Sequence, residues 1–485
     1  MKLRKILTAL NPISIKGSAD PEIQGITVDS RRVKQDFLFV AICGNKQDGT
    51  TFIDDALKRG AVAVVSENEP FINGSAVRVQ VEDARKALAS MSNIFNEFPS
   101  EKLTTIGVTG TNGKTTTSYM IRNILRRACR KPGMIGTVVY EIGDRIIPAE
   151  RTTPNAADLF NYMKKMLDVG CDSVVLEVSS HAIDQNRIHG MEFDVAVFTN
   201  LTHEHLDYHH DMEHYFAAKL GLFKQLSESD KKAFAVINAD DSYGRRLLDS
   251  PEIKVEKISF GSDPSAMVRI VDTQLKTNKS LFEIQSPWGD VAIELQLPGR
   301  FNISNAMASF SACAAIGIPL DMVSRALSEP LDVPGRLDHV HVASGYDVFV
   351  DYAHTADALK NVLLTLRELT QGRLIVVFGC GGDRDKTKRP LMGRTASDLA
   401  DLVIVTSDNP RTEEPADIIQ DILRGCPDKS DITVLSDRYE AIRFALSAAR
   451  KGDIILIAGK GHENYQDFGN RVLPFDDKHV VLEYL

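Results

Sequence analysis

The stretch GVTGTNGKTTT, residues 107–117, decides the fold of the middle of this chain. A β-branched run, TTIGV, precedes it and predicts a buried strand, and the apolar spacing of TTTSYMIRNILRRA predicts a helix directly after it. A glycine-rich turn between a strand and a helix brings backbone N–H groups and the helix N-terminus to one point, where they can bind phosphate. Lys114 can reach the terminal phosphates of a nucleotide, and the Thr115 hydroxyl can ligate Mg²⁺.

The loop is a variant of the common phosphate-binding pattern. That pattern has glycine where this chain has Val108, and the glycines here are Gly107, Gly110 and Gly113. The alternative interpretation is a glycine turn with a chance GKT, and the flanking strand and helix make it the weaker one. We therefore expect nucleotide phosphates to bind at Gly110, Thr111, Asn112, Gly113, Lys114, Thr115 and Thr116.

Length, composition and net charge limit the classes of protein to which this chain can belong. A chain of 485 residues is too long for one core and predicts two to four domains. A net charge of −9 argues against a nucleic-acid-binding protein, which usually carries a basic face. No stretch approaches the roughly 20 apolar residues of a membrane helix, so we expect no membrane insertion. Six scattered cysteines without a CxxC pair indicate reduced thiols and a cytoplasmic protein.

The pattern of expected strands and helices divides the chain into three blocks and predicts an α/β fold with three domains. Residues 1–100 predict a small N-terminal α/β domain. In residues 101–331, strands in DSVVLEV, DVAVFTN and AFAVIN alternate with helices, which predicts a P-loop ATPase-like, mostly parallel sheet; residues 268–297 read as added antiparallel strands. Residues 332–485 predict a Rossmann-like, doubly wound domain with its functional loops at the carboxyl ends of the strands.

Further motifs extend over nearly the whole chain. They are DSRRV (29–33), RTTPNA (151–156), EVSSHA (177–182), HLDYH (205–209), LPGRFNISNA (297–306), VPGRLD (333–338), DYAHT (351–355), GGDRDKTKRP (381–390), SDNPRTEEP (407–415) and GKGHE (459–463). With GTNGKTTT, they resemble the Mur ligases and folylpolyglutamate synthetases, which are ATP-dependent ligases that join a carboxylate to an amine. Within this family the resemblance is to the members that add the third residue of the peptidoglycan stem peptide.

The resemblance implies that ATP and Mg²⁺ bind in the second block. The metal ligands would be Thr115, Glu177, His205 and Lys219, the last as a lysine carbamylated by CO₂, which turns a cation into an anionic oxygen ligand. An ordinary surface lysine is the alternative for Lys219. The histidines of HEHLDYHH lack the convergent spacing of a transition-metal site, so His203, His209 and His210 are expected to be solvated or structural. Other residues implied at the nucleotide are Asn302, Asn305, Arg336, Asp351, Tyr352 and His354.

The resemblance also implies where the carboxylate substrate, UDP-N-acetylmuramoyl-L-alanyl-D-glutamate, binds. It would lie between the first two blocks, with its uridine end at Val28, Ser30, Asn45, Lys46 and Gln47. Its diphosphate, sugar and peptide would bind at Thr152, Thr153, Ser179, Gln185 and Arg187. An arginine suits a diphosphate because its guanidinium forms bidentate, charge-assisted hydrogen bonds.

Two arginines indicate the incoming amine. Arg384 and Arg411 can pair with a carboxylate, and Gly459 and Glu463 can accept an ammonium group, within a loop set that also includes Asp408, Asn409 and Pro410. This combination suits meso-2,6-diaminopimelate, whose side chain carries both groups. Lysine lacks the distal carboxylate and would leave an arginine unpaired.

The implied reaction transfers the γ-phosphoryl group to the terminal carboxylate, and the amine then displaces phosphate from the acyl phosphate. Lys114, Glu177, His205 and Lys219 would neutralise charge, and His354 or a carboxylate would take the amine proton. We expect a monomer that serves peptidoglycan synthesis and thereby cell shape and division. The alternatives are a lysine-adding Mur ligase, a folylpolyglutamate synthetase, which the DSRRV block opposes, and a nucleotide-hydrolysing switch protein.

Overall fold

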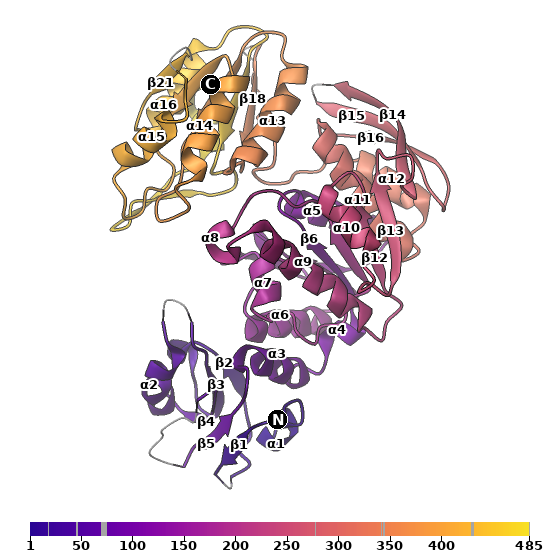
Figure 1. Cartoon of the computed structure of the whole chain (residues 1–485), viewed down its shortest axis with the longest axis vertical. Helices are drawn as coiled ribbons and strands as arrows, with labels where there is room; N and C mark the ends of the chain where they lie inside the picture. The colour runs from indigo at the N-terminus through magenta and orange to yellow at the C-terminus, as the bar shows by residue number, and fades with distance from the viewer. Residues whose placement is uncertain are drawn as a thin grey trace.

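The structure is a computed structural model that describes residues 1–17, 19–44, 47–68, 75–276, 278–340, 342, 345–427 and 431–484. The described residues form three large sheets and a small hairpin, and the three sheets follow one another along the long axis of the molecule (Figure 1). Each sheet is covered by helices, which confirms the predicted α/β fold class.

The first sheet lies at the N-terminal end of the molecule and has the strand order β1-β5-β4-β3-β2. Only β1 runs antiparallel to its neighbour in the described sheet. Its strands are β1 (Ser14–Lys16), β2 (Gly25–Thr27), β3 (Phe37–Ala41), β4 (Ala61–Ser66) and β5 (Val77–Gln80). Its helices are α1 (Leu3–Leu7), α2 (Ile53–Lys58) and α3 (Ala84–Phe95), with short 3₁₀ turns η1 (Ser30–Arg32) and η2 (Gly49–Phe52).

The central sheet has the order β16-β15-β14-β13-β12-β11-β6-β10-β7-β8-β9. Its middle is parallel: β6 (Thr104–Thr109), β7 (Pro132–Ile135), β10 (Ser173–Glu177), β11 (Val195–Phe198), β12 (Phe234–Asn238) and β13 (Glu256–Gly261). The antiparallel strands predicted over residues 268–297 are confirmed as β14 (Val268–Lys276), β15 (Lys279–Gln285) and β16 (Val291–Leu295). The opposite edge carries a second antiparallel extension, β8 (Val139–Ile142) and β9 (Arg145–Pro148), which the sequence did not reveal.

Alternate residues of the central strands enter two separate cores, as the two-residue period of a strand requires. In β11, Val195 and Val197 belong to one core, and Ala196 and Phe198 belong to the other. The helices around the central sheet are α4 (Pro99–Lys102), α5 (Lys114–Arg127), α6 (Ala156–Asp168), α7 (Ser180–Asp184), α8 (Leu206–His209), α9 (Met212–Ser227), α10 (Ser242–Asp249), α11 (Arg300–Ala315) and α12 (Leu320–Ser328).

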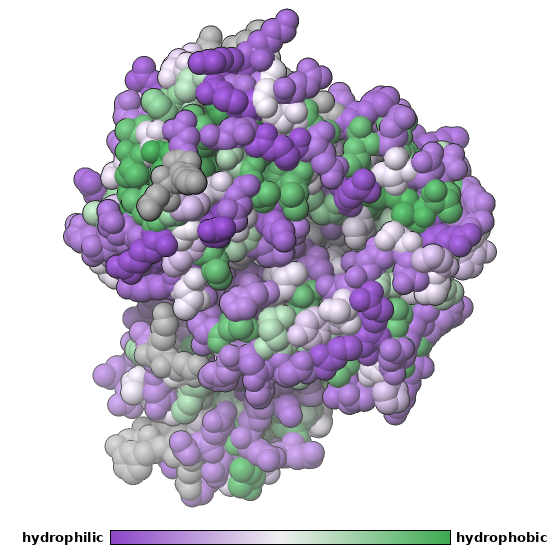
Figure 2. Space-filling view, turned by 45° about the horizontal axis from the view of Figure 1, so that its top comes forward, coloured by the Kyte–Doolittle hydropathy of each residue, from purple (hydrophilic) through white to green (hydrophobic). Residues whose placement is uncertain are grey.

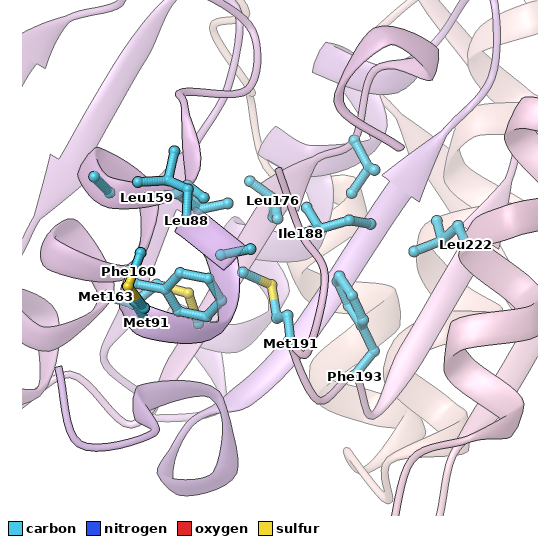
Figure 3. Close-up of a cluster of buried hydrophobic side chains, with 14 of the residues drawn as sticks. Leu88, Met91, Leu159, Phe160, Met163, Leu176, Ile188, Met191, Phe193 and Leu222 are labelled. Carbon is cyan, nitrogen blue, oxygen red and sulfur yellow. The ribbon is translucent and has the colours of Figure 1, made fainter. Parts of the chain in front are cut away.

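One hydrophobic core crosses from the first block into the second. Leu88 and Met91 of α3 pack in the same cluster as Leu159, Phe160 and Met163 of α6 (Figure 3). These side chains are almost completely buried. Apolar burial of this kind fixes the first sheet against the central one.

The third sheet has the order β17-β18-β22-β19-β20-β21 and is parallel except for β17. Helices on both of its faces form two cores, in agreement with the predicted doubly wound fold. The strands are β17 (Asp338–Val340), β18 (Asp347–Asp351), β19 (Leu374–Phe378), β20 (Leu402–Val405), β21 (Ile432–Val434) and β22 (Ile454–Ala458). The helices are α13 (Ala356–Leu369), α14 (Lys388–Leu399), α15 (Pro415–Leu423), α16 (Arg438–Ala448) and α17 (Asp477–Tyr484), and the hairpin is β23 (Tyr465–Asp467) with β24 (Val472–Pro474).

The face of the molecule in Figure 2 is mainly hydrophilic, with hydrophobic residues in separate patches. Among the described helices, none combines the length and apolar character needed to span a bilayer.

Candidate active site

The phosphate-binding loop lies between β6 and α5, at the carboxyl end of β6. Two of its glycines are required by space: a Cβ at Gly110 would collide with the Thr199 hydroxyl, and a Cβ at Gly113 would collide with the Asn305 side-chain oxygen. Gly113 also has a φ of +86°, which L side chains rarely adopt. The Asn112 backbone N–H donates to Asn200 Oδ1 at 2.9 Å. The end of β11 and helix α11 therefore hold the loop in shape.

Two lysines converge on one carbonyl of this loop. Lys114 Nζ donates to the oxygens of Gly110 (2.9 Å) and Thr111 (2.8 Å), and Lys219 Nζ donates to the same Gly110 oxygen at 2.9 Å. Lys219 is 1% exposed. Burial and the charge of Lys114 lower the pKa of Lys219, and burial also lowers the pKa of Lys114. The site therefore concentrates buried positive charge where an anionic ligand would compensate it.

Glu177 ends β10 beside the loop and is buried. It accepts hydrogen bonds from the Thr115 hydroxyl (3.0 Å) and from the backbone N–H (2.9 Å) and hydroxyl (2.8 Å) of Thr137. Two hard oxygen donors, Thr115 and Glu177, meet at a helix N-terminus, and this pair fits Mg²⁺. Thr137 was not predicted. It follows β7, whereas Glu177 ends the neighbouring parallel strand β10, so the two residues meet only in the folded sheet.

The other expected metal ligands, His205 and Lys219, are not bonded to this pair, although His205 and Thr115 line the same cleft. Among the described residues, no hydrogen bond or ion pair joins His205 or Lys219 to Glu177, and no group of three or more His, Cys, Asp or Glu side chains converges as a metal site. Partial desolvation in the cleft lowers the pKa of His205 to about 4, despite the nearby Glu204 carboxylate, although the His205 side chain is still 42% exposed. Its ring is therefore neutral near pH 7, the form in which imidazole ligates metals.

The remaining histidines of this segment are structural or exposed, as expected. His209 is buried, its Nε2 lies 2.9 Å from the Ser180 hydroxyl, and its ring stacks on Tyr215. His203 and His210 are exposed.

Residues of the third block reach the phosphate loop. Arg336 Nη2 lies 3.3 Å from the Thr115 hydroxyl, and the Arg336 guanidinium lies over the ring of Tyr352. Asp351 is buried and accepts hydrogen bonds from the backbone N–H groups of Leu337 (2.6 Å) and Ala353 (2.7 Å). It therefore fixes the backbone next to Arg336 and next to Tyr352.

Two further contacts between the blocks involve carboxylates that sequence reasoning missed. His354 Nε2 lies 3.4 Å from Glu204 Oε1, and Asn112 Nδ2 donates to Asp357 Oδ2 at 2.9 Å. Burial raises the pKa of Glu204, but the hydrogen bond with His354 and nearby positive charges outweigh it and lower the pKa overall. Glu204 is thus an anion in the cleft, and its charge is favoured by Lys114 and by the contact with His354. Its neighbour His205 was predicted as a metal ligand from the family resemblance, which gave no role to Glu204.

A cleft of about 300 Å³ lies between these blocks. Thr152, Asn305 and Phe301 line it together with the loop, Glu204, His205, Arg336, Asp351, Tyr352 and His354. Asn302 does not line it: Asn302 is 1% exposed, donates to the Pro298 carbonyl at 2.8 Å and accepts from Asn305 Nδ2 at 3.4 Å. Asn302 therefore supports Asn305 from behind.

A second cleft, of about 220 Å³, lies between the first and second blocks. It brings together Val28, Gln47, Gln185 and Arg187, which were predicted, with Arg85 and Arg151, which were not. Arg187 donates to the Thr153 carbonyl (2.7 Å) and to Gln185 Oε1 (2.8 Å), and burial lowers its pKa to about 10. Three guanidinium groups around one cleft favour a polyanionic ligand. Arg85 lies in no motif that could have shown its position, whereas Arg151 begins the RTTPNA motif, from which only Thr152 and Thr153 were predicted as ligands.

The other residues predicted for this substrate have structural roles or lie elsewhere. Thr153 is fully buried and donates to the Glu177 carbonyl at 2.7 Å, and the Ser179 hydroxyl caps α7. Ser30 is buried, and Thr152 faces the phosphate-loop cleft, where its hydroxyl lies 3.2 Å from that of Thr137. Asn45 and Lys46 lie outside the described residues.

The residues predicted for the amine gather at the carboxyl ends of β19, β20 and β22. A Cβ at Gly381 would lie 3.0 Å from Arg411 Nη1 and 3.8 Å from Arg384 Cγ, so both arginines flank this glycine. A Cβ at Gly382 would collide with the Pro410 carbonyl, which packs the two loops together. A Cβ at Gly459 would likewise lie only 2.5 Å from Asp408 Oδ2, so Gly459 packs against the Asp408 side chain.

Glu463 is already paired. Its Oε2 accepts from Asn409 Nδ2 at 2.7 Å and from Lys460 Nζ at 3.1 Å, and Lys460 also donates to Asn409 Oδ1 at 3.1 Å. Lys460 is completely buried and was not predicted, although it stands within the GKGHE motif. The structure therefore joins the SDNPR and GKGHE loops into one polar cluster.

A phosphate loop that faces a carboxylate-lined cleft, with a second α/β domain across it, defines an ATP-dependent enzyme of the ligase class. Comparison with family models gives matches to the Mur ligase family, catalytic domain over residues 22–96, the Mur ligase middle domain over residues 108–313, and the Mur ligase, glutamate ligase domain over residues 335–461. The chain belongs to the Mur ligase family.

Similar proteins cover the whole chain. A relative from Geobacter sulfurreducens named UDP-N-acetylmuramoyl-L-alanyl-D-glutamate–2,6-diaminopimelate ligase is 43% identical over 99% of this chain and 98% of its own length. A relative of the same name from Caldanaerobacter subterraneus is 44% identical over 97% of this chain and 96% of its own length. A solved structure of a ligase with this name has a TM-score of 0.71 and 34% identity, and covers 100% of this chain and 99% of that one.

Replacing Gly113 by alanine tests the loop geometry. We expect Gly113→Ala to weaken ATP binding tenfold or more, because the added Cβ meets Asn305 and the loop must shift; calorimetric titration with ATP measures this. Gly317→Ala is the matched control, since Gly317 has a φ of +82° with no atom within 4 Å of its Cβ position. The control should lose about 1 kcal/mol of stability from backbone strain and keep its ATP affinity. Equal ATP affinity in both variants would contradict the assignment.

The lowered pKa of Lys219 predicts a pH-dependent stability. Because the unfolded chain holds this proton more tightly, the contribution of Lys219 to the free energy of unfolding rises with pH from its folded pKa up to the unfolded value of about 10.4. We expect the stability of Lys219→Met relative to the unmodified protein to fall between pH 7.5 and pH 10, measured by urea unfolding in CO₂-free buffer. Lys360→Met, at an exposed lysine, should show no such trend. A pH-independent difference for Lys219→Met would contradict the burial of a titrating amine.

Proposed function

We propose that this protein is an ATP-dependent ligase that adds meso-2,6-diaminopimelate to UDP-N-acetylmuramoyl-L-alanyl-D-glutamate. The observation that carries the choice of amine is the pair Arg384 and Arg411 beside Gly381, in one loop cluster with Glu463. A side chain with both a carboxylate and an ammonium group matches this cluster, whereas lysine would leave the guanidinium groups without their carboxylate.

Residues 101–331 would bind ATP, with its phosphates on the loop and on Lys114. Thr115 and Glu177 would hold Mg²⁺, which supplies neutralisation of phosphate charge when bound. Lys219 is suited to carbamylation because its buried amine has a lowered pKa and the neutral amine is the form that adds CO₂. The carbamate would place an anion beside Lys114, where the unmodified amine offers no negative charge.

Residues 1–100, with their border to the central domain, would bind the nucleotide end of the carboxylate substrate. Arg85, Arg151 and Arg187 line that cleft and match the charge of a diphosphate. Thr152 follows Arg151 in the chain but lines the phosphate-loop cleft, so this segment leads from one cleft to the other. The substrate's terminal carboxylate would follow the same route to the γ-phosphate.

The chemistry proceeds in two displacements. A carboxylate oxygen attacks the γ-phosphorus of ATP and ADP leaves; the neutral amine of diaminopimelate then attacks the acyl carbon, phosphate leaves and the nitrogen loses a proton. Lys114 and Arg336 offset the negative charge at the reacting phosphate, and positioning supplies much of the acceleration. His354, held beside Glu204, is the candidate to accept the proton.

Residues 332–485 would bring the amine to the acyl phosphate. The residues proposed for all three substrates come from one chain, so we propose that it acts as a monomer. Its substrates, ATP and a nucleotide-linked precursor, place the reaction in the cytoplasm as a step of peptidoglycan synthesis.

Phosphate release tests the proposal. With ATP, Mg²⁺ and UDP-N-acetylmuramoyl-L-alanyl-D-glutamate present, we expect meso-diaminopimelate to raise the rate at least 100-fold more than L-lysine does, because only diaminopimelate brings a distal carboxylate to Arg384 and Arg411. Omission of the nucleotide peptide is the control and should abolish release. Preference for lysine would overturn the choice of amine, and release that ignores both additions would indicate a nucleotide-hydrolysing switch.

A further inference from the structure

Arg411 has an unusual backbone. Its φ is +54°, in the left-handed region that non-glycine residues occupy only at an energetic cost. The Arg411 N–H donates to the carbonyl of Asp467, on β23, at 2.9 Å, and Gly469 packs against the Arg411 carbonyl, with 2.7 Å to its Cβ position. The β23–β24 hairpin therefore holds Arg411 in this conformation.

Asp467 also faces the Arg411 side chain. Arg411 Nη1 donates to the Gly382 carbonyl at 2.7 Å, and Arg411 Nε lies 3.8 Å from Asp467 Oδ2. Both side chains are about three-quarters buried, with 22% and 28% exposed. Among the described residues, no hydrogen bond is made by Nη2, so one end of the guanidinium fork stays open. A carboxylate approaching that end meets a guanidinium whose orientation is already set.

The backbone of Asp467 ties the hairpin to the neighbouring loop. The Asp467 N–H donates to Asn409 Oδ1 at 3.0 Å, and the side chain of Gln466 donates to the Asp408 carbonyl at 3.0 Å. The Asp467 Oδ1 atom accepts from the Gly469 N–H at 2.8 Å, which leaves Oδ2 directed to Arg411. The contacts of Asp467 thus include the backbone and side chain of Arg411 and the side chain of Asn409.

We propose that Asp467 is a specificity-determining positioning residue, which orients the Arg411 guanidinium to receive the distal carboxylate of the incoming amino acid. The role rests on the proposed function, because it concerns the same amine. Asp467 acts through Arg411, and an amino acid without a distal carboxylate gains nothing from it. The β23–β24 hairpin therefore contributes to the preference for an incoming amino acid whose side chain carries a distal carboxylate.

A double-mutant cycle tests this role. With ATP and the nucleotide peptide saturating, we expect Asp467→Asn to raise the KM for meso-diaminopimelate about threefold to fivefold, the size expected for a partly exposed ion pair, and to leave kcat within about twofold. In the Arg411→Ala background, Asp467→Asn should change the KM by less than about twofold. Asp467→Glu, which keeps the charge, should restore most of the affinity and serves if the asparagine variant does not fold.

Asp417→Asn, at an exposed carboxylate on α15, is the matched control and should keep the KM of the unmodified protein. An unchanged KM in Asp467→Asn, or the same rise with and without Arg411, would overturn the positioning role while leaving the proposed function intact. Failure of the unmodified protein to respond to diaminopimelate, seen before any variant is compared, would overturn both.

Discussion

The carbonyl oxygen of Gly110 accepts hydrogen bonds from Lys114 and from the buried Lys219, and the site depends on this crowding of two lysine amino groups. Buried cations are costly unless they are compensated. The loop around them is closely packed, because a Cβ at Gly110 or Gly113 would collide with Thr199 or Asn305. The fold thus places two amino groups where a bound polyphosphate would favour their charged forms.

The two borders of the central domain differ in physical character. Towards the first domain, α3 and α6 share one continuous hydrophobic core (Figure 3). Towards the third domain, polar contacts predominate, namely Asn112 with Asp357, Glu204 with His354 and Arg336 with Thr115, and Phe301 is an apolar residue that packs across. A polar border separates at low cost, so the third domain is the part suited to open and close around substrates.

Sequence reasoning succeeded where the cause is local. The glycines and Lys114 follow from what one turn must do, and the parallel strands follow from continuous apolar runs. It failed where residues distant in the chain meet: Glu204 and Asp357 reach their partners only because the domains approach, and Arg85 and Arg151 share a cleft although 66 positions separate them. Short strands such as β8, β9, β23 and β24 carry too few residues for a period to appear, so the hairpin that holds Arg411 could not be predicted.

The most direct test of the account follows the oxygen atoms of the activated carboxylate. UDP-N-acetylmuramoyl-L-alanyl-D-glutamate would be labelled with ¹⁸O in its terminal carboxylate and converted with ATP and meso-diaminopimelate, and the released phosphate analysed by mass spectrometry. Attack of the carboxylate on ATP predicts one ¹⁸O atom in each phosphate and one in the new amide. Unlabelled phosphate would contradict the acyl phosphate and, with it, the assignment of the phosphate loop to carboxylate activation.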